Sequence, residues 1–194
     1  MRKYFIRTPY WVRGVYPSAT WTRDENIDAE GHLHITIDDG PHPKSTPKWL
    51  DLLNRTDQTA TFFLLGSAAL LYPSIVEEIK SEGHSIASHG MDHWDGWRVD
   101  TTKYVDQVLQ SLELLECHRF RPPYGRMTPV QYRRLLKKCD IYLWSMMPGD
   151  FDQRASESDM EARLKCKRES DIIVFHDTPS AFTKVERAFL STFS

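Results

Sequence analysis

The chain has 194 residues, 40% of them hydrophobic and 27% charged, which is the composition of a folded domain with a sizeable core rather than of a disordered segment. Its formal net charge of −2 argues against a domain that mainly binds nucleic acid, because such domains carry a strong positive excess. No apolar run approaches the roughly 18 residues that a membrane-spanning helix needs.

The N-terminus and the cysteines carry information about the cellular compartment. No apolar stretch follows the first basic residues, so we expect no secretory signal and a cytoplasmic protein. The three cysteines have no CxxC spacing, which predicts reduced thiols rather than a framework of disulfides.

The first 23 residues differ in composition from the rest of the chain, with five Lys or Arg, six aromatic side chains and no acid. One interpretation is a patch that lies on a membrane surface. Pro9, Gly14 and Pro17 interrupt the long amphipathic helix that such a patch would need, which favours an extended arm whose aromatics pack on the domain. We therefore expect an arm over residues 1–30 and a single domain over residues 31–194.

From residue 32 onward, β-rich runs alternate with helical patterns. In chain order they are strand 32–37, helix 46–54, strand 59–65, helix 68–80, strand 84–88, helix 101–116, strand 118–121, helix 129–138, strand 141–145, helix 156–167, strand 171–175 and helix 180–190. Six strands that alternate with helices predict a parallel sheet covered by helices, either an open doubly wound sheet or a barrel.

Polar residues that can do chemistry follow five of the six predicted strands. They are Asp38 and Asp39 after the first strand, His89 after the third, Arg121 at the end of the fourth, Asp150 shortly after the fifth and His176 after the sixth. In a parallel barrel the carboxyl ends of the strands share one face, which is where active sites form. Solvated charges would show no such preference, so the pattern predicts a site at this face.

Two histidines and two carboxylates have the composition of a hydrolytic metal site. His89 and His93 are four residues apart, and on a helix this spacing would place both imidazoles on one face. Gly90 stands where the HExxH motif of zinc proteases has its catalytic Glu. Asp38 and Asp39 could simply form a turn, but successive side chains at a strand end point in different directions. One carboxylate could then bind a metal with the histidines, leaving positions open for water, while the other acts as general base.

Arg121 and His176 could complete such a site. Arg121 opens the rigid turn Arg-Pro-Pro-Tyr-Gly, which is either a simple connector or a device that holds the guanidinium against a carboxylate. His176 directly follows a buried strand, where a histidine is more often structural than catalytic. Here it would act as the general acid, a role for which the other candidate residues offer no group, and this favours the catalytic interpretation.

Together these motifs resemble the polysaccharide deacetylase family, also called the NodB homology domain or carbohydrate esterase family 4, from about Leu33 to Asp177. The family motifs occur in order at residues 36–40 (T-[FI]-D-D-G), 89–93 (H-[ST]-x-x-H), 121–125 (R-x-P-[YF]-G), around Asp150 (D-x-x-D-W) and at 174–176 (L-x-H). The resemblance implies an α/β fold, a distorted (β/α)7 barrel of the TIM-like type with parallel strands and outer helices. Because only six β–α units are apparent, a seventh strand would be short or lie in the N-terminal arm.

The resemblance also implies a role for each site residue. It makes Asp38 the catalytic base, Asp39, His89 and His93 the metal ligands, Arg121 the residue that orients the base, Tyr124 the donor of a backbone amide to the oxyanion, His176 the general acid and Asp150 its partner. The wall of the substrate pocket would consist of Trp144, Met146, Met147 and Phe151. One divalent metal is implied, with Zn²⁺ expected and Co²⁺, Ni²⁺ or Mn²⁺ as alternatives.

The sequence departs from the family pattern in two motifs. Gly90 replaces the Ser or Thr of the second motif, so we expect one hydrogen bond that supports the metal site to be absent. Met147 and Phe151 replace the first Asp and the Trp of the fourth motif. This leaves Asp152 as a competitor for the role of Asp150.

The combined interpretation is a metal-dependent hydrolase that removes the N-acetyl group from an N-acetylated sugar, in a polysaccharide, an oligosaccharide or a glycan precursor. Hydrolysis of another amide, such as a formyl group or a cyclic amide, would use the same site residues. A non-catalytic carbohydrate-binding relative is an alternative of a different class. The expected partner is thus an N-acetylated glycan rather than nucleic acid, and the sequence leaves the oligomeric state open.

Overall fold

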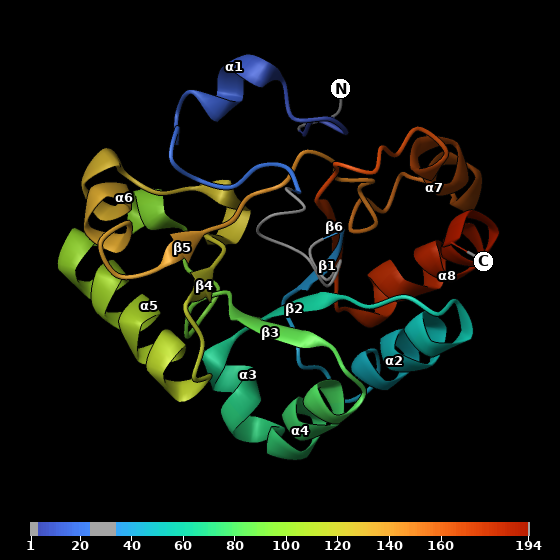
Figure 1. Ribbon diagram of the computed structural model, residues 1–194, viewed down its shortest axis with the longest axis horizontal. Coiled ribbons are helices and arrows are strands. Elements are labelled where there is room, and N and C mark those ends of the chain that lie inside the picture. The colour runs from blue at the N-terminus through green and yellow to red at the C-terminus, as the bar shows by residue number, and fades with distance from the viewer. Residues whose placement is uncertain (1–3, 24–33, 194) are drawn as a thin grey trace.

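Six strands form one parallel sheet that is curled into a half-barrel (Figure 1). The computed structural model describes residues 4–23 and 34–193. The strands are β1 (Ile35–Asp38), β2 (Thr61–Leu64), β3 (Ser85–Ser88), β4 (Arg119–Phe120), β5 (Asp140–Ile141) and β6 (Ile173–His176). Their order is β5-β4-β3-β2-β1-β6, and each neighbouring pair is parallel. The predicted class, an α/β fold with a distorted parallel barrel, is confirmed.

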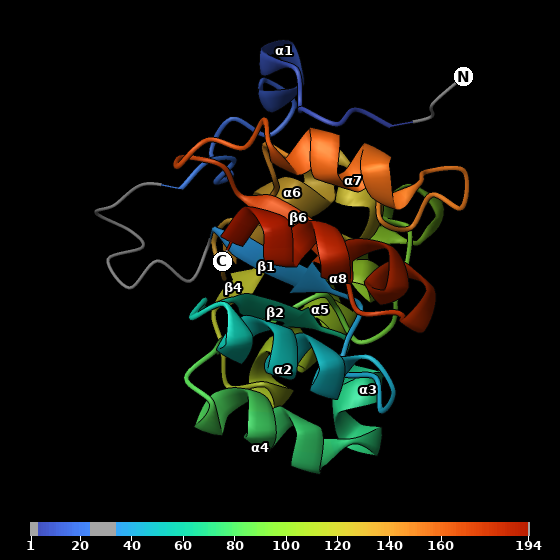
Figure 2. The ribbon, with the colours of Figure 1, turned by 90° about the vertical axis from the view of Figure 1, so that its right-hand side faces the viewer.

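Helices cover the outer side of the sheet (Figure 2). In chain order they are α2 (Thr46–Arg55), α3 (Gly66–Leu71), α4 (Pro73–Ser81), α5 (Thr101–Leu114), α6 (Pro129–Leu135), α7 (Glu157–Leu164) and α8 (Pro179–Phe193). The short helix α1 (Tyr10–Arg13) belongs to the N-terminal segment and lies apart from the sheet. The prediction of one helix over residues 68–80 was wrong, because Pro73 lacks the N–H of a continuous helix and starts α4 instead. No helix within residues 4–23 and 34–193 is long and apolar enough to cross a membrane.

Alternation along β1 separates the core from the inner face of the half-barrel. Ile35 and Ile37 are buried in a hydrophobic cluster with the helices, so Thr36 and Asp38 face the other side of the sheet. Trp49 of α2 anchors the outer cluster against three rings, those of Phe175, Phe182 and Phe189. The strands are therefore fixed by apolar packing on their outer face, while polar groups gather on the inner one.

Residues of the N-terminal segment lie across the opening of the half-barrel. Thr20 forms a parallel bridge with Tyr142, just beyond β5, and Thr22 forms an antiparallel bridge with Asp171, just before β6. Single bridges thus link the two edges of the sheet where a seventh strand was expected. The predicted boundary between arm and domain, at residue 30, lies outside the described residues.

Candidate active site

The parallel register of β1 and β6 brings two predicted catalytic residues together. Asp38 ends β1 and His176 ends β6, and the two are direct register partners. The Asp177 amide donates a hydrogen bond of 2.7 Å to the Asp38 carbonyl, which fixes this pairing. His89 and Arg121 directly follow β3 and β4, so they reach the same edge of the sheet.

Asp39, His89 and His93 converge on one point. The Oδ1 atom of Asp39 lies 3.5 Å from Nε2 of His89 and 3.2 Å from Nε2 of His93. Ligands bound to zinc at about 2.1 Å in a tetrahedral arrangement are roughly 3.4 Å apart, so the three atoms fit a single ion. The Asp39 oxygen is buried and receives no well-directed hydrogen bond from the described residues, which leaves it available to a cation. The three residues form a possible metal site with two imidazoles and one carboxylate.

The surroundings of His89 and Asp39 favour the protonation states that a cation needs. Burial lowers the pKa of His89, and its Nδ1 lies 2.8 Å from the carbonyl oxygen of Arg121. Because a carbonyl can only accept a hydrogen bond, Nδ1 carries the proton and Nε2 offers a lone pair. Burial alone would raise the pKa of Asp39, but the imidazoles of His93 and His89 hold that pKa well below its usual value. The carboxylate is therefore ionised at neutral pH.

A loop rather than a helix carries both histidines. Gly90 has a φ of 86°, a left-handed conformation that interrupts any helical path between His89 and His93. The helical explanation of their spacing was therefore wrong. The two rings nevertheless lie close together, with centroids 5.1 Å apart.

Helix α5 and strand β3 hold this loop in place. The Met91 amide donates to Oε1 of Gln107 at 2.7 Å, and the Ser111 hydroxyl donates to the Gly90 carbonyl at 3.1 Å. The Gly90 amide donates to the Ser88 hydroxyl at 3.0 Å. A Cβ at Gly90 would come within 2.9 Å of Oε1 of Gln107. Gln107 thus occupies the space that a larger residue at position 90 would need, and it supports the loop backbone from there.

Asp38 is buried next to Arg121 and has its own surroundings. Nη1 of Arg121 donates to Oδ1 of Asp38 at 2.7 Å and to the Thr36 hydroxyl at 2.8 Å. The guanidinium is fully buried and lies over the Phe63 ring, 3.9 Å from its centroid. The other carboxylate oxygen of Asp38, Oδ2, is 4.0 Å from Nε2 of His89. Arg121 therefore holds one oxygen while the second faces the metal site, the placement that its predicted orienting role needs.

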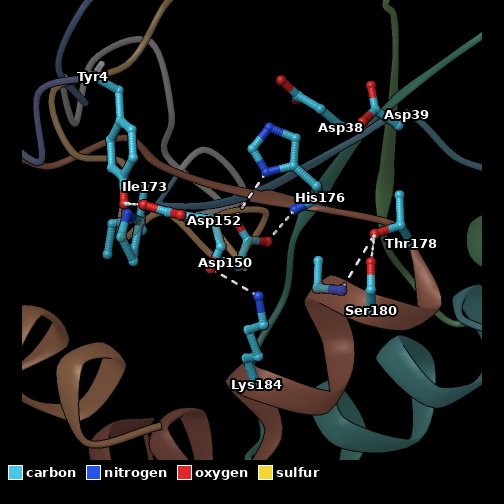
Figure 3. A network of polar contacts seen from close by, with 12 residues as sticks. Tyr4, Asp38, Asp39, Asp150, Asp152, Ile173, His176, Thr178, Ser180 and Lys184 are labelled. Carbon is cyan, nitrogen blue, oxygen red and sulfur yellow. Dashed lines mark hydrogen bonds and ion pairs between the residues drawn. The ribbon is translucent and has the colours of Figure 1, made fainter. Parts of the chain in front are cut away.

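The His176 ring lies against Asp150 rather than Asp152 (Figure 3). Its backbone amide donates to Oδ2 of Asp150 at 2.7 Å, and its Nδ1 lies 2.9 Å from Oδ1. Burial would lower the pKa of His176, but the charge and hydrogen bond of Asp150, with Asp39 and Asp38 further away, raise this pKa to about 9. Asp152 instead forms an ion pair with Arg154. Of the two competing carboxylates, Asp150 has the position that a partner of the acid requires.

Two predicted site residues have left-handed backbone conformations. The φ angle is 77° at Asp39 and 59° at Tyr124, a conformation that costs a non-glycine residue about 1–3 kcal/mol. The Tyr124 ring is exposed and packs edge-on against His93, with centroids 4.5 Å apart. Such strain is common where a main-chain group must point at a ligand. The oxyanion role of the Tyr124 amide stays a prediction.

These groups surround one cavity of about 360 Å³. The predicted residues that line it are Asp38, Asp39, His89, His93, Tyr124, Trp144, Met147, Phe151 and His176. Met146 does not line it but is buried in the core, because its backbone bridges that of Ile173 and both side chains belong to the same hydrophobic cluster.

Three further lining residues were missed by the sequence analysis, namely Tyr4, Arg126 and Val174. Val174 lies two residues before His176 on the same strand, so strand alternation could have identified it. Tyr4 belongs to the aromatic N-terminal segment, whose composition was the only signal. One cavity thus brings together a possible metal site, a buried carboxylate–arginine pair and a carboxylate–histidine pair. These are the groups that a metal-dependent hydrolase needs.

Comparison with known proteins identifies the family. The polysaccharide deacetylase family matches residues 25–144. The chain is 30% identical over 166 residues to a peptidoglycan-N-acetylglucosamine deacetylase of Bacillus cereus, covering 81% of this chain and 76% of that protein. It is 32% identical over 157 residues to a chitooligosaccharide deacetylase of Azorhizobium caulinodans, covering 76% and 74%. The crystal structure of the Bc1960 peptidoglycan N-acetylglucosamine deacetylase has a TM-score of 0.82 at 28% identity, covering 96% of this chain and 89% of that one.

The chain belongs to the polysaccharide deacetylase family. This confirms the resemblance drawn from the five motifs. It also confirms the predicted class of enzyme, a deacetylase that hydrolyses a carbon–nitrogen bond of N-acetylated sugars. The roles of the individual side chains stay predictions, which the geometry described above makes specific.

Proposed function

We propose that this protein hydrolyses the acetamide group of N-acetylglucosamine units in an oligosaccharide or polysaccharide, releasing acetate and a free amine. The observation that supports the proposal is the register pairing of Asp38 with His176, because both side chains line the cavity that the possible metal site also lines. The two relatives named above support the choice of sugar, since they are deacetylases of peptidoglycan N-acetylglucosamine and of chitooligosaccharides.

Asp39, His89 and His93 would hold the cation, and we propose Zn²⁺ because two histidines and a carboxylate are a common catalytic zinc set. When bound, such an ion lowers the pKa of a coordinated water to about 7 and polarises the acetamide oxygen. Asp38 then removes a proton from the attacking water through Oδ2, because Arg121 holds Oδ1.

His176 supplies the proton that the leaving amine needs. Its Nδ1 is bound to Asp150, so Nε2 is the atom that can donate to the substrate. The Asp150 carboxylate raises the pKa of His176, which favours the charged imidazole that can act as an acid. The Tyr124 amide would donate a hydrogen bond to the oxygen on which negative charge develops.

Acetate release from N-acetylglucosamine oligomers tests the proposal. We expect release by the purified protein, loss of release after treatment with a chelator, and recovery on addition of Zn²⁺. Acetate release from peptidoglycan, measured in parallel, tests whether the protein also acts on a polymer. Binding of the oligomers without acetate release in the presence of Zn²⁺, Co²⁺, Ni²⁺ or Mn²⁺ would contradict the proposal and favour a non-catalytic carbohydrate-binding protein. Turnover of a formylated or cyclic amide alone would favour a different amide as the substrate.

A further inference from the structure

A second hollow adjoins the candidate active site on the side of the N-terminal arm, here residues 4–23. It has a volume of about 200 Å³ and shares four lining residues with the main cavity, which are Tyr4, Tyr124, Trp144 and Met147. On its far side the hollow is lined by the arm residues Phe5, Thr8, Val12 and Trp21. The two hollows are therefore adjacent, and we call the second one the arm groove.

Hydrogen bonds hold the arm against the domain close to this groove. The Thr8 hydroxyl donates to the Trp144 carbonyl at 2.8 Å, and the Tyr4 hydroxyl donates to Oδ2 of Asp152 at 3.2 Å (Figure 3). A Cβ at Gly149 would clash with the Tyr4 ring, so the arm and the loop that carries Asp150 are in close contact there. The wall of the groove is therefore a fixed part of the fold.

Aromatic side chains stay exposed along the arm beside the groove. Phe5 is 55% exposed and Trp11 is 71% exposed, and the two rings pack edge to face with centroids 6.3 Å apart. On the opposite wall, the Tyr124 ring is also exposed. Exposed aromatics gathered beside a cavity mark a binding surface rather than a core.

We propose that the arm groove is a second sugar subsite, which binds the sugar unit next to the one that is deacetylated. This inference rests on the proposed function. A pyranose ring has C–H groups on its faces and hydroxyl groups at its edge, so aromatic walls can contact the faces while the hydroxyls stay in water. Phe5 is then a specificity-determining residue that makes the protein prefer longer oligosaccharides.

The composition of the groove favours a neutral sugar over an anionic membrane surface. Peripheral binding to anionic lipids uses apolar side chains together with basic ones. Among the described residues, no lysine or arginine lines the arm groove. Arg7, an arm residue close by in sequence, is engaged with the buried Asp171 in an ion pair of 2.7 Å.

The test compares the binding of one sugar unit and of two linked units to the zinc-loaded full chain. Asp38→Asn is used as background, so that N-acetylglucosamine and its dimer are bound with little turnover, and dissociation constants come from titration calorimetry. We expect the dimer to bind more tightly than the single sugar. Phe5→Ala should reduce this gain by about fivefold, the effect of losing one aromatic contact. Tyr10→Ala is the matched control, since Tyr10 is an exposed arm aromatic that does not line the groove.

Each outcome bears on the subsite separately from catalysis. A gain in affinity with length that Phe5→Ala reduces and Tyr10→Ala preserves supports the subsite, whether or not the wild-type protein releases acetate. Equal affinity for the single sugar and the dimer, or a gain that survives Phe5→Ala, overturns it even if acetate is released. The subsite is also overturned if Phe5→Ala weakens binding to phosphatidylserine vesicles but leaves the gain in affinity with sugar length unchanged. That result would favour the membrane interpretation.

Discussion

Asp38 and Asp39 are neighbours in the chain, yet their carboxylates have different surroundings. Arg121 binds Asp38 on the inner face of the half-barrel, whereas Asp39 leaves the strand with a φ of 77° and meets the two histidines. Removing one charge should therefore have a different consequence from removing the other. Asparagine keeps the shape of either side chain, so the comparison isolates the function of each carboxylate.

Asp38→Asn should abolish the proton transfer and leave the possible metal site intact. We expect acetate release to fall by about 100- to 10,000-fold, the usual contribution of a general base. Zinc binding, measured by titration calorimetry, should stay close to that of the wild-type protein. Asp39→Asn is the matched control and should weaken zinc binding itself. Full activity of Asp38→Asn would contradict the role of the base, and unchanged zinc affinity of Asp39→Asn would contradict the metal site.

Titration of His176 should report its contact with Asp150. In the metal-free protein we expect an NMR titration midpoint near pH 9, because the Asp150 carboxylate stabilises the imidazolium against burial. Asp150→Asn should lower this midpoint. A folded-state pKa above the ordinary value of 6.5 adds stability below that pH, and this contribution disappears as the pH rises toward 9. The same midpoint in the wild type and in Asp150→Asn would show that the pair does not interact.

At the scale of elements, the order of strands and helices could be predicted from the sequence, but some local conformations could not. Apolar periodicity is strong in the strands because they are buried. The break before Pro73 was missed because apolar residues continue on one face across it. The spacing of His89 and His93 is equally compatible with a helix and with a loop, and the left-handed conformation of Gly90 selects the loop. The sequence thus predicted which residues form the possible metal site, but not the local structure of the loop that carries the two histidines.

Gln107 of α5 should be needed to keep the loop of residues 89–93 in its metal-binding shape. Its Oε1 accepts a hydrogen bond from the amide of Met91, which lies between the two histidines in the chain. The structure shows no hydrogen bond from Gln107 to either imidazole. Gln107→Ala should weaken zinc binding by about tenfold, the lower end of what supporting residues contribute. Gln110→Ala, an exposed change on the same helix, is the matched control. Equal zinc affinity in calorimetry for both variants would refute the role of Gln107.

At the scale of the whole molecule, the arm was the part least accessible to sequence reasoning. Its aromatic composition predicted packing on the domain, but its contacts join positions far apart in the chain, such as Tyr4 and Asp152, which are 148 positions apart. Single bridges at Thr20 and Thr22 leave no strand periodicity in the sequence. The barrel class and most of the site could therefore be predicted from local patterns and family motifs, whereas the way the arm spans the opening required the structure.

The ion pair between Arg7 and Asp171 should determine how firmly the arm is held. Arg7 donates to both carboxylate oxygens at 2.9 and 2.7 Å, and the Asp171 side chain is only 2% exposed. Arg7→Ala leaves a buried carboxylate with one partner fewer, so we expect the free energy of unfolding at pH 7 to fall by about 2 kcal/mol. Lys165→Ala, which removes an exposed ion pair with Glu161, is the control and should have little effect.

The pH dependence of that loss separates an electrostatic contact from simple packing. Burial alone would raise the pKa of Asp171, but the hydrogen bonds of Arg7, of the Arg168 amide and of Ser145 lower it in the folded protein. A lowered folded-state pKa gives stability that is present at neutral pH and is lost as the pH falls. Without Arg7 this pKa rises, so Asp171 is protonated sooner and the difference between wild type and variant should shrink in acid. Denaturation curves that differ equally at pH 7 and pH 3 would show that Arg7 stabilises the arm through packing instead.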